Sequence, residues 1–298
     1  MAKGKVAINC EYAALRCCCG VVNAVPYPLA MALARTLARL AFFLGFKRRR
    51  TLDRIRGVFP GIAGEEAKRI AVNSLANVLC TAVEMIRAPQ LTRAWMDRYV
   101  VEGAKYARML SEIVEEAHGA VIMVPHSGNW YMAAWAMAKY GIPLFAIAAR
   151  QRNPKIDAWM NRQYGDIEVL DRDCRDTLGK IKEYLAGGRA FAILPDLRVR
   201  RRDVAAEFLG GDANVSHAGA MFAIHAKVPI VVAAMTRENG KHVINYLAKL
   251  PSDGKTPEKL TQEVMKILSD FVMEHPSDWY WYNKRWILEP VEDEPRHG

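Results

Sequence analysis

The sequence lacks the short motifs that identify several large enzyme classes. Its 298 residues contain no Gly-x-Ser-x-Gly, P-loop, Gly-x-Gly-x-x-Gly or His-Glu-x-x-His pattern, so serine hydrolases, nucleoside triphosphatases, dinucleotide-dependent enzymes and zinc peptidases have no support. Cysteine is scarce as well. The six cysteines show no zinc-ligand spacing, and three of them are adjacent, which no regular disulfide framework accommodates. We therefore expect a reducing compartment, no metal site and no cofactor.

The chain also lacks internal repeats, low-complexity segments and any Gly-, Pro- or Ser-rich linker that would divide its second half. Apolar residues make up 51% and charged residues 25%, which predicts one large or two ordinary globular domains. A net charge of +10 and a pI near 9.3 indicate anionic partners: nucleic acid, an anionic membrane surface or phosphorylated substrates. No RNP-like, helix-turn-helix or zinc-finger pattern occurs, so we expect no nucleic-acid partner.

The N-terminal segment combines an apolar helix with a basic cluster. Residues 1–25 are interrupted by charges and show no clean cleavage site, so no signal peptide is predicted. The segment from Leu29 to Phe46 predicts a helix of roughly 27 Å, interrupted by Arg35 and Arg39. It is short for a hydrocarbon core of about 30 Å, so a helix lying in the membrane interface fits better. Lys47 to Arg50 follow at once, a composition typical of an anionic-lipid contact, although such a run can also be merely solvated. We predict that residues 1–50 anchor the chain to a membrane.

Residues 51–298 are predicted to form a single α/β domain. Short apolar runs alternate with amphipathic segments between residues 118 and 250, which predicts a mostly parallel central sheet covered by helices. The predicted strands are 120–125, 143–149, 167–170, 190–194, 229–235 and 242–247. The predicted helices are 65–87, 104–117, 156–164, 177–185, 217–226 and 260–274, with another starting near residue 132.

Three predicted strands are each followed by an ionisable residue that could take part in catalysis or binding. His126 follows the strand that contains Val124, Arg150 follows Ala149, and Asp196 follows the strand that contains Leu194. Because the carboxyl ends of parallel strands meet at one edge of the sheet, we expect a base, a cation and a carboxylate to face one pocket. The arginines from Arg198 to Arg202 add positive charge there. Taken singly, each has a plainer explanation: the histidine or aspartate could cap a turn, and the arginines could be solvated.

The order of these and other motifs resembles the lysophospholipid acyltransferase superfamily, in particular the branch of the bacterial lipid A late acyltransferases and the mycobacterial phosphatidylinositol mannoside acyltransferases. The Pro-Glu-Gly-Thr block of the glycerol-phosphate branch is absent. The resemblance runs almost end to end and rests on the N-terminal apolar helix with its basic exit, Phe59-Pro60, Val101-Glu102-Gly103, His126-Ser127-Gly128-Asn129-Trp130, Arg150 with Asn153-Pro154, Leu194-Pro195-Asp196, Phe208-Leu209-Gly210 with Ser216, and Trp279-Tyr280-Trp281 with Arg285-Trp286.

The resemblance implies a membrane-associated O-acyltransferase at the cytoplasmic face of a bacterial inner membrane. It would move an acyl chain from an acyl-carrier-protein or coenzyme A thioester to a hydroxyl of a phosphorylated glycolipid such as a lipid A precursor. In the family's motif of His, four residues, then Asp or Glu, the histidine is the general base and the acid stabilises the imidazolium. The resemblance thus assigns His126 as base. The strand-end argument and the resemblance together predict Arg150, Asn129, Arg198 and Ser216 as substrate-binding residues, and we expect Arg150, helped by the arginines from Arg198 to Arg202, to hold phosphate.

The chain departs from the motif at its acid. Tyr131 stands where the family has Asp or Glu, and a phenol carries no charge to stabilise an imidazolium. Either another carboxylate does this work, with Asp196 as the first choice, or the protein is a weakly active or inactive homologue that binds acyl lipid. We keep Tyr131 with His126 and Asp196 among the candidate catalytic residues, because a phenol can accept one hydrogen bond from the imidazole ring. A second departure is Asn283, where the lipid A enzymes often have histidine.

Overall fold

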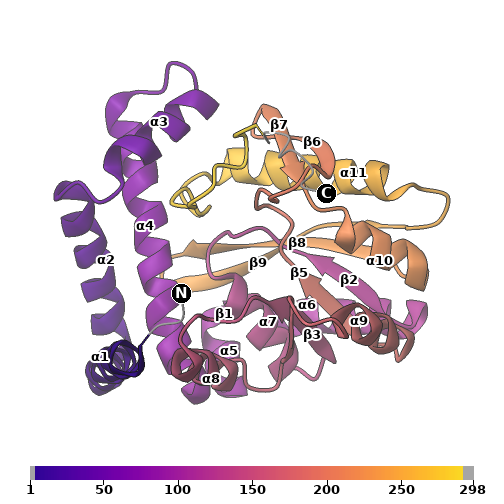
Figure 1. Cartoon of the computed structure of the whole chain (residues 1–298), viewed down its shortest axis with the longest axis horizontal. Coiled ribbons are helices and arrows are strands. Elements are labelled where there is room, and N and C mark those ends of the chain that lie inside the picture. The colour runs from indigo at the N-terminus through magenta and orange to yellow at the C-terminus, as the bar shows by residue number, and fades with distance from the viewer. Residues whose placement is uncertain (1–3, 291–298) are drawn as a thin grey trace.

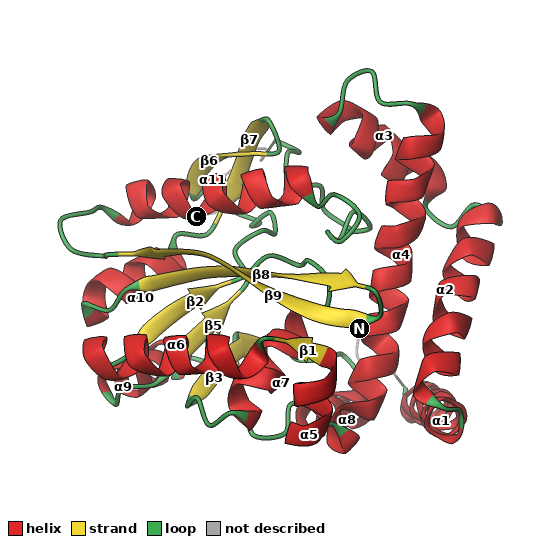
Figure 2. Cartoon of the chain, turned by 180° about the vertical axis from the view of Figure 1, so that it is seen from behind, coloured by secondary structure: helices red, strands yellow, loops and turns green. Residues whose placement is uncertain are grey.

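The computed structural model describes residues 4–290 and contains a seven-stranded sheet in the order β1-β9-β8-β2-β5-β3-β4 (Figures 1 and 2). All neighbouring pairs are parallel except β8 and β9, which are antiparallel. The predicted fold class, a mostly parallel sheet covered by helices, is confirmed. The strands of this sheet are β1 (Val100–Val101), β2 (Ala120–Met123), β3 (Leu144–Ala148), β4 (Glu168–Asp171), β5 (Ala190–Ile193), β8 (Ile230–Glu238) and β9 (Lys241–Leu250).

Helices cover both faces of the sheet because its central strands are apolar on both sides. In β2, Val121 and Met123 join one hydrophobic cluster and Ile122 joins another, as expected for side chains that alternate between faces. The first cluster includes residues of α9, α10 and α11, and the second includes residues of α5, α6 and α7. These helices and the neighbouring α8 are α5 (Arg93–Tyr99), α6 (Gly103–Ala117), α7 (Trp130–Lys139), α8 (Pro154–Gln163), α9 (Thr177–Ala186), α10 (Ala218–Ala226) and α11 (Pro257–Glu274).

The chain from Lys5 to Gln90 is helical, apart from short connections. Figures 1 and 2 show α2 beside α4 at one end of the molecule, with the sheet on the other side of α4. This region consists of α1 (Lys5–Ala24), α2 (Tyr27–Phe43), α3 (Arg48–Val58), α4 (Gly64–Arg87) and the short 3-10 helix η1 (Ala88–Gln90). The small residues Ala30, Ala34 and Ala38 of α2 are buried, whereas Leu37 and Phe43 are exposed. Thus α2 packs against the protein through one face and leaves large apolar side chains on the other.

The predicted helix from Leu29 to Phe46 is wrong at its end. Helix α2 stops at Phe43, where Gly45 and Lys47 adopt positive φ angles of 93° and 47°, and α3 then leaves at a bend of 92°. The basic cluster is therefore the first turn of a second helix, and the predicted boundary after residue 50 falls inside it. The sequence prediction also missed β1, α1, α5 and the separate hairpin of β6 (Val204–Phe208) and β7 (Gly211–Val215).

Among the described residues, one continuous helical stretch, Gly64–Gln90, is long and apolar enough to cross a membrane, and half of its most apolar window is buried inside the protein. Helices α2 and α3 meet the same criterion only when taken together as a bent pair. The burial of α4 between α2 and the sheet is that of a core helix.

Candidate active site

The ends of β2 and β5 bring His126 and Asp196 into contact. The two strands are neighbours in the sheet, and Met123 is in register with Ile193, so the residues that follow them emerge side by side. His126 Nδ1 lies 2.7 Å from Asp196 Oδ1. Asp196 Oδ2 accepts hydrogen bonds from the backbone N–H of His126 at 2.7 Å and from Trp279 Nε1 at 2.8 Å. The structure thus joins two of the three residues that the strand-end argument singled out.

The surroundings of Asp196 keep it ionised. Its side chain has no exposed surface, and burial alone would raise its pKa. The charge and hydrogen bonds of His126, with the hydrogen bond from Trp279, outweigh burial, so the pKa of Asp196 lies below its usual value. A carboxylate can only accept hydrogen bonds, so His126 Nδ1 carries the proton and Nε2 is the atom available as a base.

The turn that carries His126 is held from two directions. Ser127 Oγ donates to the carbonyl of Met235 in β8 at 2.8 Å. Gly128 has φ +54°, and a Cβ there would lie 2.6 Å from that same carbonyl oxygen, so only glycine fits. On the other side, the backbone N–H of Tyr280 donates to the carbonyl of His126 at 3.0 Å. The Trp-rich segment of residues 277–286, called the closing segment below, therefore packs directly on the turn.

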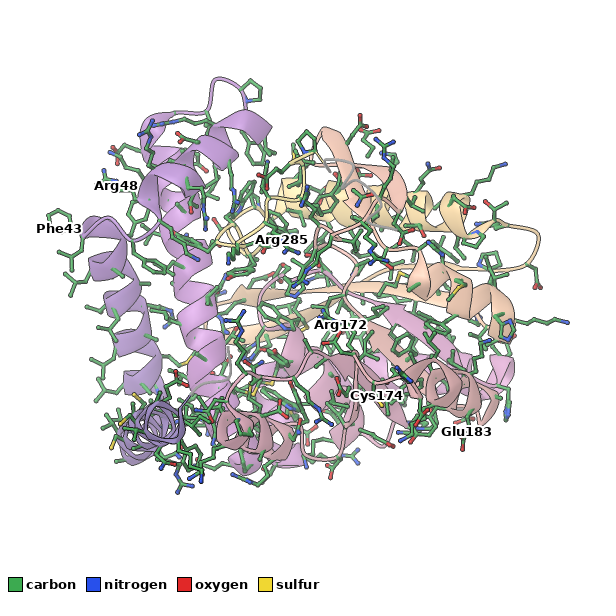
Figure 3. The ribbon with its side chains drawn as sticks, in the orientation of Figure 1. Phe43, Arg48, Arg172, Cys174, Glu183 and Arg285 are labelled. Carbon is green, nitrogen blue, oxygen red and sulfur yellow. The ribbon has the colours of Figure 1, made fainter. Side chains whose placement is uncertain are left out.

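His126 lines a cavity of about 1040 Å³ at the carboxyl edge of the sheet. Most of its wall is apolar and comes from both layers, for example from Met137 in α7 and Phe222 in α10. The wall also contains five basic side chains: Arg172, Arg198, Arg200, Lys284 and Arg285. Figure 3 labels two of them, Arg172 from the connection between β4 and α9 and Arg285 from the closing segment. The cavity can hold a long apolar chain and an anionic group together.

Tyr131 lines this cavity but lies outside the His–Asp pair. Its ring stacks on Trp135 at a centroid distance of 5.7 Å and lies 6.3 Å from Tyr164. Burial raises the pKa of its phenol, which therefore stays neutral. No hydrogen bond joins Tyr131 to His126 or Asp196 within the described part of the chain. Asp196, and not Tyr131, occupies the position of partner to the histidine.

The remaining predicted residues fall into two groups. Arg198 and Ser216 line the cavity, although Arg198 Nε also donates to the carbonyl of Glu289 at 2.7 Å. Arg150 does not line it: the side chain is 73% exposed and pairs with Asp171 at 2.8 Å. Asn129 is fully buried behind the turn, where it caps α7. The structure thus places Arg150 and Asn129 apart from the cavity wall.

Sequence reasoning missed Arg172, Lys284 and Arg285 as cavity residues and Trp279 as a partner of Asp196. Arg172 directly follows β4, so the argument used for the other strand ends would have found it. Trp279 carried no such signal, because its role depends on the closing segment folding back over the sheet. Within residues 4–290, no group of three or more His, Cys, Asp or Glu side chains could hold a metal ion.

A histidine–aspartate pair beside a largely apolar cavity in a covered α/β sheet is an arrangement suited to proton transfer next to an apolar chain. The family model of the bacterial lipid A biosynthesis acyltransferases matches residues 12–287, and the chain belongs to this family. The protein is therefore an acyltransferase.

Two curated relatives support the same branch at low identity. The phosphatidylinositol mannoside acyltransferase of Mycolicibacterium smegmatis is 22% identical over 294 residues, which cover 93% of this chain and 91% of the relative. The protein of the same name from Mycobacterium tuberculosis H37Rv is 21% identical over 253 residues, covering 82% of this chain and 78% of the relative.

Proposed function

We propose that the protein transfers a fatty acyl chain from an acyl thioester to a hydroxyl of a lipid A precursor or a similar glycolipid, with His126 as the general base. The observation that carries this proposal is the His126–Asp196 pair at the wall of the apolar cavity. The family, and the activity for which the two mycobacterial relatives are named, agree with a glycolipid acceptor.

In this mechanism the acceptor hydroxyl gives its proton to His126 Nε2 while its oxygen attacks the thioester carbonyl. The imidazolium that forms is stabilised by the ionised Asp196 at 2.7 Å. Collapse of the tetrahedral intermediate breaks the carbon–sulfur bond, and the leaving thiolate takes the proton from the imidazolium. The products are the new ester and a free thiol. Backbone N–H groups at the start of α7, next to His126, are suited to stabilise the oxyanion.

The donor in this proposal is an acyl-carrier-protein or coenzyme A thioester, and the acceptor carries phosphate. The apolar wall fits the acyl chain, and the arginines and lysine of the cavity suit phosphate groups, because guanidinium groups match phosphate oxygens in a fixed geometry. In this proposal Arg200, Lys284 and Arg285 bind phosphate. The sequence prediction gave this role to Arg150 with help from Arg198 to Arg202, but Arg150 lies outside the cavity wall.

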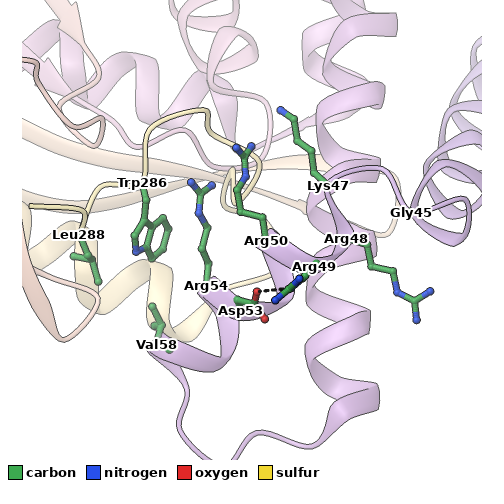
Figure 4. A pocket seen from close by; sticks show the side chains of 11 residues that line it. Gly45, Lys47, Arg48, Arg49, Arg50, Asp53, Arg54, Val58, Trp286 and Leu288 are labelled. Atoms are coloured by element: carbon green, nitrogen blue, oxygen red, sulfur yellow. Dashed lines mark ion pairs between the residues drawn. The ribbon is translucent and has the colours of Figure 1, made fainter.

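We also propose that α2 and α3 hold the protein on an anionic membrane, at the cytoplasmic face of a bacterial inner membrane. Leu33, Leu37, Leu40 and Phe43 are about half exposed or more. After the end of α2 lies a recess of about 770 Å³, which is lined by the basic residues from Lys47 to Arg50 and by Arg54; Asp53 is the one acid among the described residues that line it (Figure 4). Apolar insertion and charge attraction together supply the two signals that stable anchoring requires.

A homologue that binds acyl lipid without transferring it is the alternative, and Tyr131 in place of the motif acid favours it.

One experiment separates the enzyme from the non-catalytic lipid-binding homologue. Purified protein is incubated with an acyl thioester and a glycolipid acceptor, and the acylated lipid is measured by mass spectrometry for wild type, His126→Ala and Asp196→Asn. Transfer by wild type that both substitutions abolish supports the enzyme. A wild type that binds the acyl chain but forms no product, or a fully active His126→Ala variant, overturns it.

A further inference from the structure

A second charged cluster lies behind the His126 turn, away from the cavity wall. At its centre is Glu84 of α4, whose side chain has no exposed surface. Its carboxylate accepts hydrogen bonds from Tyr27 Oη at 2.6 Å, Asn129 Nδ2 at 2.7 Å and both terminal nitrogens of Arg237 at 2.8 and 2.9 Å, and it lies 3.0 Å from His242 Nε2. None of these five residues lines the cavity, so substrate contact does not account for the cluster.

The charge on Glu84 determines how the amide of Asn129 is oriented. Burial alone would raise the pKa of Glu84, but the charges of His242 and Arg237 outweigh it and hold the pKa well below its usual value. Because the ionised carboxylate only accepts, the amide must turn its Nδ2 toward Glu84. Its Oδ1 then accepts the backbone N–H of Met132 at 3.1 Å. One side chain thus caps α7 and ties it to α4.

This tie acts on the residues around His126. Trp130 is the first residue of α7, directly after Asn129, and its ring meets the His126 ring edge-on at a centroid distance of 4.9 Å. Helix α4 also reaches the turn through Thr81, whose Oγ1 lies 3.4 Å from the carbonyl of Gly128. Thr81 and Glu84 are three residues apart on one face of α4, so a single rigid helix supports the turn from behind.

We propose that Glu84 is a positioning residue for the general base, acting through Asn129 to fix the start of α7 against the His126 ring. The inference rests on the proposed acyl transfer, in which His126 must meet a hydroxyl at the edge of the cavity. A displacement of about 1 Å at such a base can lower the rate about a hundredfold. The capping role of Asn129 and its tie to Glu84 can be separated, because serine caps a helix as well as asparagine but is too short to reach Glu84.

The test compares Asn129→Ser with Tyr27→Phe as a matched control, because Tyr27→Phe removes a different hydrogen bond from the same carboxylate. The expected result for Asn129→Ser is a fall in kcat of about tenfold, with KM changed less than twofold. Tyr27→Phe should keep the wild-type kcat. In the double variant Glu84→Gln with Asn129→Asp, the amide and the carboxylate exchange places. The hydrogen bond between residues 84 and 129 is kept with its donor and acceptor reversed, and one negative charge remains beside Arg237. This double variant should recover most of the kcat that Asn129→Ser loses.

A second readout does not depend on activity. The ring-proton NMR resonance of His126, assigned by its loss in His126→Ala, reports the position of the Trp130 ring, and it should move in Asn129→Ser but not in Tyr27→Phe. An unchanged kcat or an unmoved resonance in folded Asn129→Ser overturns the positioning role, even if the melting temperature falls. If wild type transfers no acyl chain, the proposed function fails, and the resonance alone decides whether Glu84 positions His126.

Discussion

The indole N–H of Trp279 donates a 2.8 Å hydrogen bond to Oδ2 of Asp196, the carboxylate that also contacts His126. Trp279 is almost fully buried, and its ring meets that of Trp281 at 5.0 Å in an edge-on arrangement. The closing segment is thus part of the site: it helps to fix the orientation of the carboxylate that pairs with His126.

Replacing Trp279 with phenylalanine should lower both activity and stability. The substitution removes one hydrogen bond to a buried carboxylate, a loss typically worth about 1–3 kcal/mol. We expect kcat to fall about tenfold or more, since about 1.4 kcal/mol corresponds to a factor of ten. Initial rates of acyl transfer and urea unfolding measure the two effects. Trp286→Phe is the control, because its ring belongs to the same aromatic cluster but makes no hydrogen bond to Asp196; an equal loss in both variants would contradict a specific role for Trp279.

The stability of the protein should depend on Asp196 at low pH. The folded-state pKa of this carboxyl lies below its usual value, so Asp196 contributes stability above the unfolded pKa of about 3.9, and this contribution is lost as the pH falls toward the folded pKa. Asp196→Asn should therefore lose less stability than wild type between pH 5 and pH 3. Urea unfolding at several pH values measures this difference, and parallel curves for the two proteins would contradict the direction of the shift.

Tyr131→Glu, which restores the family motif, should not accelerate the enzyme. The new carboxylate would lie in an aromatic wall beside Trp135 and Tyr164, where burial disfavours its charge, and Asp196 already occupies His126 Nδ1. We expect a rate no higher than that of wild type and a lower melting temperature. A clear gain in kcat would show that Asp196 does not fully supply the missing acid.

Arg150→Lys should leave KM for donor and acceptor within about twofold of wild type, because Arg150 pairs with Asp171 outside the cavity wall. Arg285→Lys should raise KM for a phosphorylated substrate, since lysine keeps the charge but loses the planar fork. Steady-state kinetics with each substrate varied in turn measures both. If KM rises in Arg150→Lys and not in Arg285→Lys, Arg150 and not Arg285 contacts the phosphate, and the prediction is wrong.

Membrane binding should weaken when the exposed face of α2 is made polar. Phe43 is 77% exposed, so Phe43→Glu should not disturb the core, yet it removes an apolar side chain whose insertion is worth about 1.5–3 kcal/mol. Flotation with anionic vesicles should fall more than tenfold, and Arg49→Glu should weaken it by about 1 kcal/mol or more. Met273→Glu in α11 is the control at another exposed apolar position. Equal flotation of all variants would remove α2 from the membrane contact.

Local patterns in the sequence were enough to predict most of the central sheet and the place of His126 at the end of one of its strands. The apolar run of residues 120–125, followed by Ser127, Gly128 and Asn129, predicts a strand, a turn and a helix start because each step depends on neighbouring residues. The rule that parallel strands end at one edge placed His126 and Asp196 at the same pocket, and they lie 2.7 Å apart. Composition also indicated an exposed apolar surface beside a basic cluster.

Contacts between distant segments were decided only by the tertiary structure. The residues near Arg150 in the sequence do not show that its guanidinium group forms an ion pair with Asp171. The residues near Glu84 likewise do not show that this buried carboxylate accepts hydrogen bonds from Asn129 and Arg237. The sequence left open whether the carboxylate missing at position 131 is replaced. The pairing of β2 with β5 places the carboxylate of Asp196 against His126. This contact could not be read from the sequence, because strand order and the fold of the closing segment depend on packing across the whole molecule and not on the residues beside His126.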